Sequence, residues 1–191
     1  MDFQALLKSL ETHPVIPAVR GDAALRLALQ SSAPALFLVS SSILTLEDSV
    51  AACREADKAA FVHVDLADGL GHDEAAARWC VERLRVDGVI STRPSLLKAA
   101  SDLGAMTVQR LFLMDSTSFE RGKRLLKANP PDMAEIMPGI APKAVRQLCE
   151  VLDSPVIAGG LITEPREIIQ ALQAGAMAVS AGVPALWNVT L

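Results

Sequence analysis

Short apolar runs rich in β-branched residues alternate along the chain with segments in which apolar residues recur every three or four positions. The first pattern predicts buried strands and the second predicts amphipathic helices. The expected strands are Val15–Val19, Ala35–Val39, Ala60–Leu66, Gly88–Ser91, Met106–Phe112, Met133–Met137, Pro155–Ala158 and Ala178–Ser180. The expected helices are Ala23–Gln30, Leu46–Ala56, Asp73–Leu84, Ser95–Leu103, Ser116–Ala128, Pro142–Leu152 and Pro165–Ala174.

This order of strand and helix, with short joints, predicts an α/β fold whose strands pair in parallel through right-handed crossovers. The number of strands favours closure into one compact TIM-like (β/α) barrel spanning residues 1–191. Only Ala181–Leu191 follow the last strand, so the last helix is expected to be abbreviated or absent. An open doubly wound sheet is the alternative.

The opening segment places Phe3, Leu6, Leu7 and Leu10 on one helical face. Such a face is suited to covering the lower end of a barrel or an exposed sheet edge.

Composition narrows the class of protein further. Of the 191 residues, 51% are hydrophobic and 4% aromatic, so aliphatic side chains must fill the core. A formal net charge of −4 argues against a broad basic surface for nucleic acid, although a local patch remains possible. No apolar run approaches the roughly 18 residues that cross a membrane, and a cytoplasmic location is expected. Cys53, Cys80 and Cys149 lack metal-binding or redox spacing, so no metal site is predicted.

Glycines follow the seventh and eighth expected strands. Gly159 and Gly160 come directly after one, and Gly182 comes shortly after Ser180 at the end of the other. In βα barrels these two loops frequently bind phosphate through backbone N–H groups. A structural turn would explain the glycines equally well, and Ser180 could bond to local backbone instead of a ligand.

Three polar side chains are expected to point into the barrel. The period of two along a strand places His63 and Asp65 opposite the apolar Val62 and Val64. The same alternation turns Glu135 inward from the sixth strand. The two carboxylates could accept hydrogen bonds from a polyol or transfer protons, or form an internal salt bridge to Arg20 or Arg110.

The densest basic run lies on one expected helix and consists of Arg121, Lys123, Arg124 and Lys127. A solvated helix face is the ordinary interpretation of such a run. It is also the place where clustered cations could contact RNA despite the chain's net negative charge.

Six ordered blocks together resemble the glycerol-3-phosphate-responsive antiterminator family over nearly the whole chain. These blocks are Pro14–Val19, Phe61–Leu70, Asp87–Thr92, Val108–Ser116, Glu135–Gly139 and Pro155–Ile162. Two segments depart from the family pattern, namely Ser40–Ser42 after the second strand and Ala181–Gly182 after the last.

The resemblance implies a non-enzymatic regulator that senses glycerol 3-phosphate and acts on leader mRNA to prevent premature transcription termination. It implies no cofactor besides this effector and no membrane partner, and it leaves a homo-oligomer open. It also suggests that Gly139, Gly159 and Gly160 help to hold phosphate. Four further residues are expected to line the ligand cavity, namely His63, Asp65, Gln109 and Glu135.

Two other functions compete with this one, because a barrel fold alone does not determine function. The first is a phosphosugar isomerase, aldolase or metal-assisted hydrolase. No expected strand carries an inward lysine for an aldolase Schiff base, whereas Asp65 and Glu135 could serve an isomerase or hydrolase. The second is an interaction protein with an idle barrel, which predicts no selective binding of small molecules.

Overall fold

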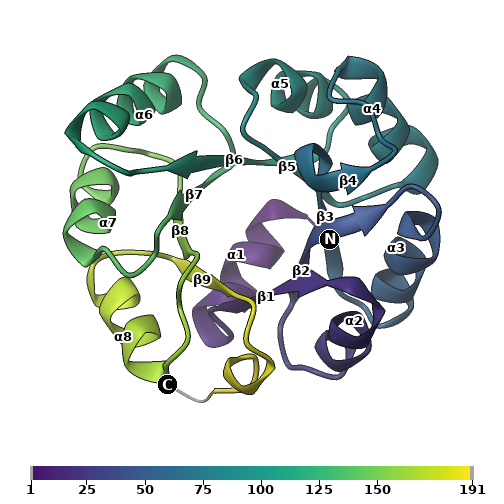
Figure 1. Cartoon of the computed structure of the whole chain (residues 1–191), viewed down its shortest axis with the longest axis horizontal. Helices are drawn as coiled ribbons and strands as arrows, with labels where there is room; N and C mark the ends of the chain where they lie inside the picture. The colour runs from purple at the N-terminus through teal and green to yellow at the C-terminus, as the bar shows by residue number, and fades with distance from the viewer. Residues whose placement is uncertain (1, 190–191) are drawn as a thin grey trace.

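The chain folds as a closed parallel barrel, seen along its axis in Figure 1. The computed structural model describes residues 2–189. The strands follow one another around the ring in the order β1-β9-β8-β7-β6-β5-β3-β2, and β1 pairs with β2 to close it. The ring strands are β1 (Val15–Arg20), β2 (Ala35–Ser42), β3 (Ala59–His63), β5 (Gly88–Ser91), β6 (Met106–Phe112), β7 (Met133–Met137), β8 (Val156–Gly159) and β9 (Ala178–Ala181). The predicted barrel is confirmed, and the open doubly wound sheet is excluded.

A short extra strand, β4 (Ala67–Asp68), extends the upper end of β2 and was not predicted. It pairs in parallel with Ser41 and Ser42. A 3-10 turn separates it from β3, and residues 67–72, called the flap below, line one side of the barrel mouth.

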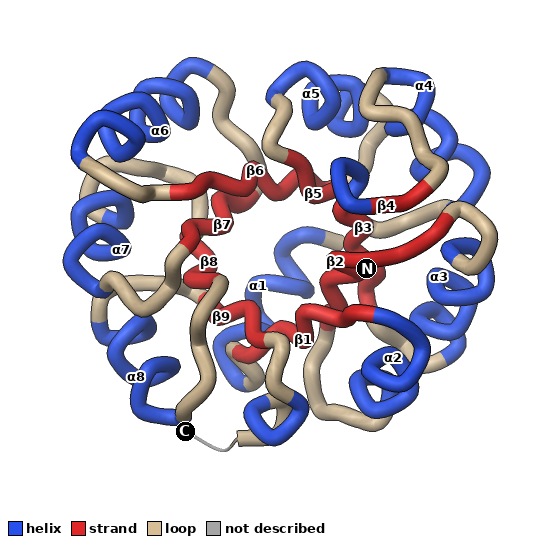
Figure 2. The backbone as a smooth tube through the Cα atoms, viewed as in Figure 1, coloured by secondary structure: helices blue, strands red, loops and turns tan. Residues whose placement is uncertain are grey.

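Helices surround the ring of strands, as Figure 2 shows. They are α2 (Gly21–Leu29), α3 (Leu46–Glu55), α4 (Glu74–Arg78), α5 (Pro94–Asp102), α6 (Ser116–Ala128), α7 (Pro142–Cys149) and α8 (Pro165–Gln173). A π-helical segment, η2 (Trp79–Leu84), continues α4. Up to residue 189, a 3-10 turn, η3 (Pro184–Leu186), is the only helical element after β9. The expected abbreviation of the last helix is confirmed. None of the helices in residues 2–189 has the length and apolar character needed to cross a bilayer.

The N-terminal helix α1 (Phe3–Thr12) closes the lower end of the barrel, as its apolar face predicts. Leu6 and Leu10 are fully buried in a cluster with inward residues of the strands, including Phe37 and Phe61. A second apolar cluster joins the outer faces of the strands to the helices. The lower half of the interior is therefore filled, and the polar inward residues among positions 2–189 lie in the upper half.

The third strand is shorter than predicted. It ends at His63, and the chain turns through a 3-10 segment, η1 (Val64–Leu66). Leu66, the last residue of the expected strand, is 43% exposed. The turn allows the Asp65 carboxylate to reach the end of β5, where Thr92 N–H donates to it at 2.7 Å.

The cysteines form no disulfide. Burial raises the pKa of Cys53 to about 11 and that of Cys80 to about 12. Both thiols are therefore protonated at neutral pH and act as small apolar side chains.

Candidate ligand-binding site

A buried ion pair lies in the upper half of the barrel interior. Register places Arg110 of β6 beside Glu135 of β7, and the Arg110 Nε–H donates to Glu135 Oε2 at 2.5 Å. Ser180 Oγ donates to the other carboxylate oxygen at 2.5 Å. All three side chains are at most 3% exposed. The inward position of Glu135 is confirmed, and so is the internal salt bridge that was the alternative to ligand contact.

Two buried side chains at this place, one of them in the ion pair, keep polar atoms that have no hydrogen-bond partner among the described residues. They are the Nη2 of Arg110 and both ring nitrogens of His63. Burial, and next the positive charge of Arg110, lower the pKa of His63 to about 4, and the Asp65 carboxylate only partly opposes them. The His63 ring is therefore neutral at pH 7, with one donor and one acceptor nitrogen. Unsatisfied buried donors are costly and rare, so they indicate a place where a polar ligand would bind.

The Asp65 carboxylate is bound mainly by neighbouring residues of the chain. Its Oδ2 accepts hydrogen bonds from Ser91 Oγ at 2.9 Å, from Thr92 N–H at 2.7 Å and from Thr92 Oγ1 at 3.1 Å. Its Oδ1 lies 3.4 Å from Arg93 Nε and has no hydrogen bond. Asp65 thus anchors η1 to the end of β5, and one oxygen remains for a ligand.

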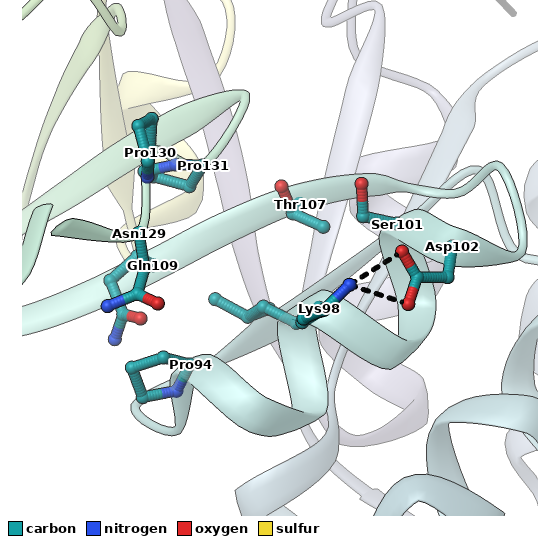
Figure 3. A pocket seen from close by; sticks show the side chains of 10 residues that line it. Pro94, Lys98, Ser101, Asp102, Thr107, Gln109, Asn129, Pro130 and Pro131 are labelled. Atoms are coloured by element: carbon teal, nitrogen blue, oxygen red, sulfur yellow. Dashed lines mark hydrogen bonds and ion pairs between the residues drawn. The ribbon is translucent and has the colours of Figure 1, made fainter.

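Gln109 does not lie in the barrel interior. Alternation along β6 places Met106, Val108 and Arg110 inward, so Gln109 faces outward between α5 and α6 (Figure 3). Its Nε2 donates to the carbonyls of Ser91 and Arg110, each at 3.2 Å. The prediction that Gln109 lines the ligand cavity inside the barrel is therefore wrong. The alternation that points His63 and Glu135 inward indicates Arg110, and not Gln109, as the inward polar residue of this strand.

Close packing explains two of the predicted phosphate-binding glycines. The Gly139 N–H donates to the carbonyls of Gly159 and Gly160, and a Cβ on Gly139 would lie 2.8 Å from the Gly159 nitrogen. A Cβ on Gly159 would collide with Ser180 Oγ and would lie 2.7 Å from Glu135 Oε1. Both positions require glycine whether or not a ligand binds.

Gly160 and Gly182 lie at the rim of the mouth. Gly160 has φ +78°, a conformation that favours glycine. A Cβ on Gly182 would be 3.9 Å from its nearest neighbour, the carbonyl oxygen of Ala18. Space is therefore available at Gly182, and phosphate binding by these two loops stays a prediction.

An open cavity of about 370 Å³ lies at the upper ends of β1, β2 and β3. Its polar lining comes from Arg20, Ser40, Asp65, Asp68 and His72. Arg20 also contributes to lowering the pKa of His63, which indicates that the cavity and the buried polar groups are close. Ser40, Asp68 and His72 were not predicted, because the flap that brings the last two over the mouth has no helix or strand pattern.

The basic run lies on α6, outside the barrel. Lys123 is 28% exposed, donates to Glu120 at 2.9 Å and lies 5.8 Å from the Phe119 ring centre. Arg121, Arg124 and Lys127 are exposed and form no ion pair within residues 2–189. Three of the four predicted cations are therefore available to a partner.

Within residues 2–189, His, Cys, Asp and Glu side chains do not gather in threes that could hold a metal ion. The site consists instead of one unsatisfied cation, a neutral imidazole and carboxylates that the protein itself engages. A closed parallel barrel with these buried polar side chains beneath its C-terminal mouth places the protein in the TIM-like class.

Comparison with known sequences shows the family. The family model described as glycerol-3-phosphate responsive antiterminator matches residues 15–187. The chain belongs to this family. Membership supports a regulatory role in antitermination.

Three relatives cover nearly the whole chain. The uncharacterized protein YgcP of Escherichia coli (strain K12) is 36% identical over 183 residues, which are 96% of each chain. The structure of a glycerol uptake operon antiterminator regulatory protein from Listeria monocytogenes is 31% identical, with TM-score 0.87 over 91% of this chain and 94% of that one. A related Thermotoga maritima protein, named glycerol uptake operon antiterminator-related, is 29% identical, with TM-score 0.81 over 92% of this chain and 98% of that one.

Proposed function

We propose that this protein senses glycerol 3-phosphate in the barrel mouth and, when loaded, acts on leader mRNA to prevent premature termination in genes for glycerol use. The observation that carries the proposal is the set of unsatisfied donors on His63 and Arg110, in a chain of the antiterminator family. The free Arg110 Nη2 suits the phosphate, and the neutral His63 suits a hydroxyl. The name of the Listeria relative supports the glycerol operon as the target.

The proposed function requires no turnover. Glu135 already binds Arg110 and Ser180, and Asp65 already binds Ser91 and Thr92. A general base for an isomerase would have to leave these partners. An assay for products from phosphorylated trioses and polyols tests the enzyme alternative, and product formation lost in Glu135→Gln would favour it.

Glycerol 3-phosphate is expected to stabilise the fold, whereas glycerol is not. At about a hundred times the dissociation constant, the ligand should add roughly 2.7 kcal/mol to the free energy of unfolding. Urea denaturation with glycerol 3-phosphate, glycerol and inorganic phosphate measures this difference. Equal stabilisation by glycerol and glycerol 3-phosphate, or none by either, would contradict a site that recognises the phosphate group.

Gly160→Val is expected to lose the response to glycerol 3-phosphate, because valine disfavours φ +78° and adds bulk at the rim. Gly104→Val is the matched control, since Gly104 has φ +86° in the loop between α5 and β6, at the other end of the barrel. Both variants should lose stability in urea, and only Gly160→Val should lose ligand stabilisation. A full response in a folded Gly160→Val protein would mean that this loop is only a turn.

The exposed cations of α6 are proposed to bind RNA phosphates. Neutralising two of them in Arg121→Gln/Arg124→Gln should reduce the slope of log affinity against log salt by about 1.4, since each phosphate contact on a single strand contributes about 0.7. Arg26→Gln/Arg83→Gln removes two exposed cations elsewhere and should leave the slope unchanged. Filter binding to leader RNA, with and without glycerol 3-phosphate, measures both. An unchanged slope in the α6 variant would make this run a solvated helix face.

A further inference from the structure

The barrel wall has a cavity between α5 and α6 that the effector site does not use. It has a volume of about 210 Å³ and lies over the outer face of β6 (Figure 3). Its lining includes Pro94, Lys98, Gln109, Asn129, Pro130 and Pro131. α5, β6 and the segment after α6 all contribute to it.

The floor of this cavity is polar where a barrel strand normally presents apolar side chains to its helices. Thr107 and Gln109 are 2% and 1% exposed, whereas the neighbouring strand β5 presents Val89. Thr107 is accounted for, because its hydroxyl donates to Asp132 Oδ2 at 2.8 Å and accepts from the Asp132 N–H at 3.0 Å. Polar groups at this depth have protein partners or face a space that water or a ligand can fill.

Only one end of the Gln109 carboxamide has hydrogen-bond partners in the protein. Its Nε2 donates to two backbone carbonyls. Its Oε1 accepts no hydrogen bond from the described residues and is not among the fully buried atoms, so it is open to the cavity. The fixed Nε2 holds the side chain in place, so an acceptor oxygen is left at the floor of the cavity.

The cavity walls suit a flat ring. Pro94 on one side and Pro130 and Pro131 on the other are rigid and apolar, and the exposed Asn129 adds a second carboxamide (Figure 3). Lys98 and Asp102 form an ion pair of 2.9 Å at one end. Carboxamides read the edges of nucleobases, and flipped bases stack between apolar or aromatic side chains.

Cations for a nucleic-acid backbone lie on α6, the helix that leads into the cavity lining at Asn129. Asn129, which lines the cavity, is the C-cap residue of α6. Arg121 and Arg124 are exposed on α6, about two turns and about one turn before it. The pairing of a polar flat-walled cavity with free cations favours a nucleotide over an apolar peptide.

We propose that this cavity receives one base of single-stranded leader RNA while Arg121 and Arg124 bind the adjoining phosphates. The proposal rests on the proposed function, since it names the place where the RNA binds. Gln109 Oε1 accepts a hydrogen bond from an exocyclic amino or ring N–H group of the base. Asn129 contacts the base edge nearer the surface.

Two variants test the cavity without touching the effector site. Ser101→Trp fills it from an exposed position on α5, and Asn129→Ala removes the outer carboxamide. Gln147→Trp is the control, since Gln147 is exposed in the groove between α6 and α7. Leader-RNA affinity is measured by filter binding over a range of salt, and urea denaturation with glycerol 3-phosphate reports the effector site.

Ser101→Trp and Asn129→Ala are expected to lower RNA affinity about tenfold, a typical loss for one base contact. The salt slope, the response to glycerol 3-phosphate and the affinity of Gln147→Trp should all stay at the parent's values. Parental affinity in both cavity variants, or an equal loss in Gln147→Trp, would overturn the base site and leave the proposed function standing.

Two other results would overturn the proposal in different ways. Loss of antitermination in a transcription assay, with RNA affinity intact in both cavity variants, would assign the cavity to a protein partner. Absence of leader-RNA binding by the parent, with and without glycerol 3-phosphate, would overturn the base site together with direct RNA binding.

Discussion

Replacing Arg110 by methionine is expected to lower the free energy of unfolding by about 3–5 kcal/mol, because it leaves Glu135 buried without its cation. Glu135 is 0% exposed and Arg110 is 3% exposed, so water cannot substitute for the lost partner. Ser180 would remain as a single donor to the carboxylate. Chemical denaturation of the parent and of Arg110→Met at pH 7 measures the loss.

The double variant Arg110→Met/Glu135→Gln separates the two sources of this effect. If the penalty comes from the unpaired carboxylate, removing the charge should restore most of the stability. Equal losses in the single and double variants would instead assign the cost to packing around residue 110. Neither protein should respond to glycerol 3-phosphate, since Arg110 Nη2 is the proposed phosphate donor.

The architecture could be predicted from the sequence because each repeat carries its own local signal. β-branched runs and helical periodicity mark the elements, and the pairing of β1 with β2 settles closure over the open sheet. The exact end of β3 could not be predicted, because the alternation of His63 and Asp65 continues through a 3-10 turn that the pattern does not reveal.

The candidate site could be predicted only in part, since its chemistry depends on contacts between strands. Alternation identified Glu135 as an inward residue, but only the register of β6 against β7 selects Arg110 over Arg20 as its partner. Likewise, Gly139 and Gly159 look like anion-binding glycines in the sequence. Their close approach to each other and to Ser180 becomes visible only in three dimensions.

His63 is expected to make the protein less stable in acid. Its pKa is about 4 in the folded chain and about 6.5 in an unfolded one, so between these values only the unfolded chain binds the proton. The stability that the neutral His63 contributes is therefore fully present above pH 6.5 and falls as the pH drops. At pH 4 the free energy of unfolding has fallen by about 3 kcal/mol from this source.

Carboxylates also titrate in this range, so the measured quantity is the difference between the parent and His63→Asn in urea denaturation at pH 7, 5.5 and 4.5. That difference should shift in favour of the variant as the pH falls, whereas His13→Asn, which removes an exposed histidine, should follow the parent. Parallel pH profiles for the parent and His63→Asn would show that the imidazole is not held neutral in the barrel, and the hydroxyl-binding role assigned to it would fail.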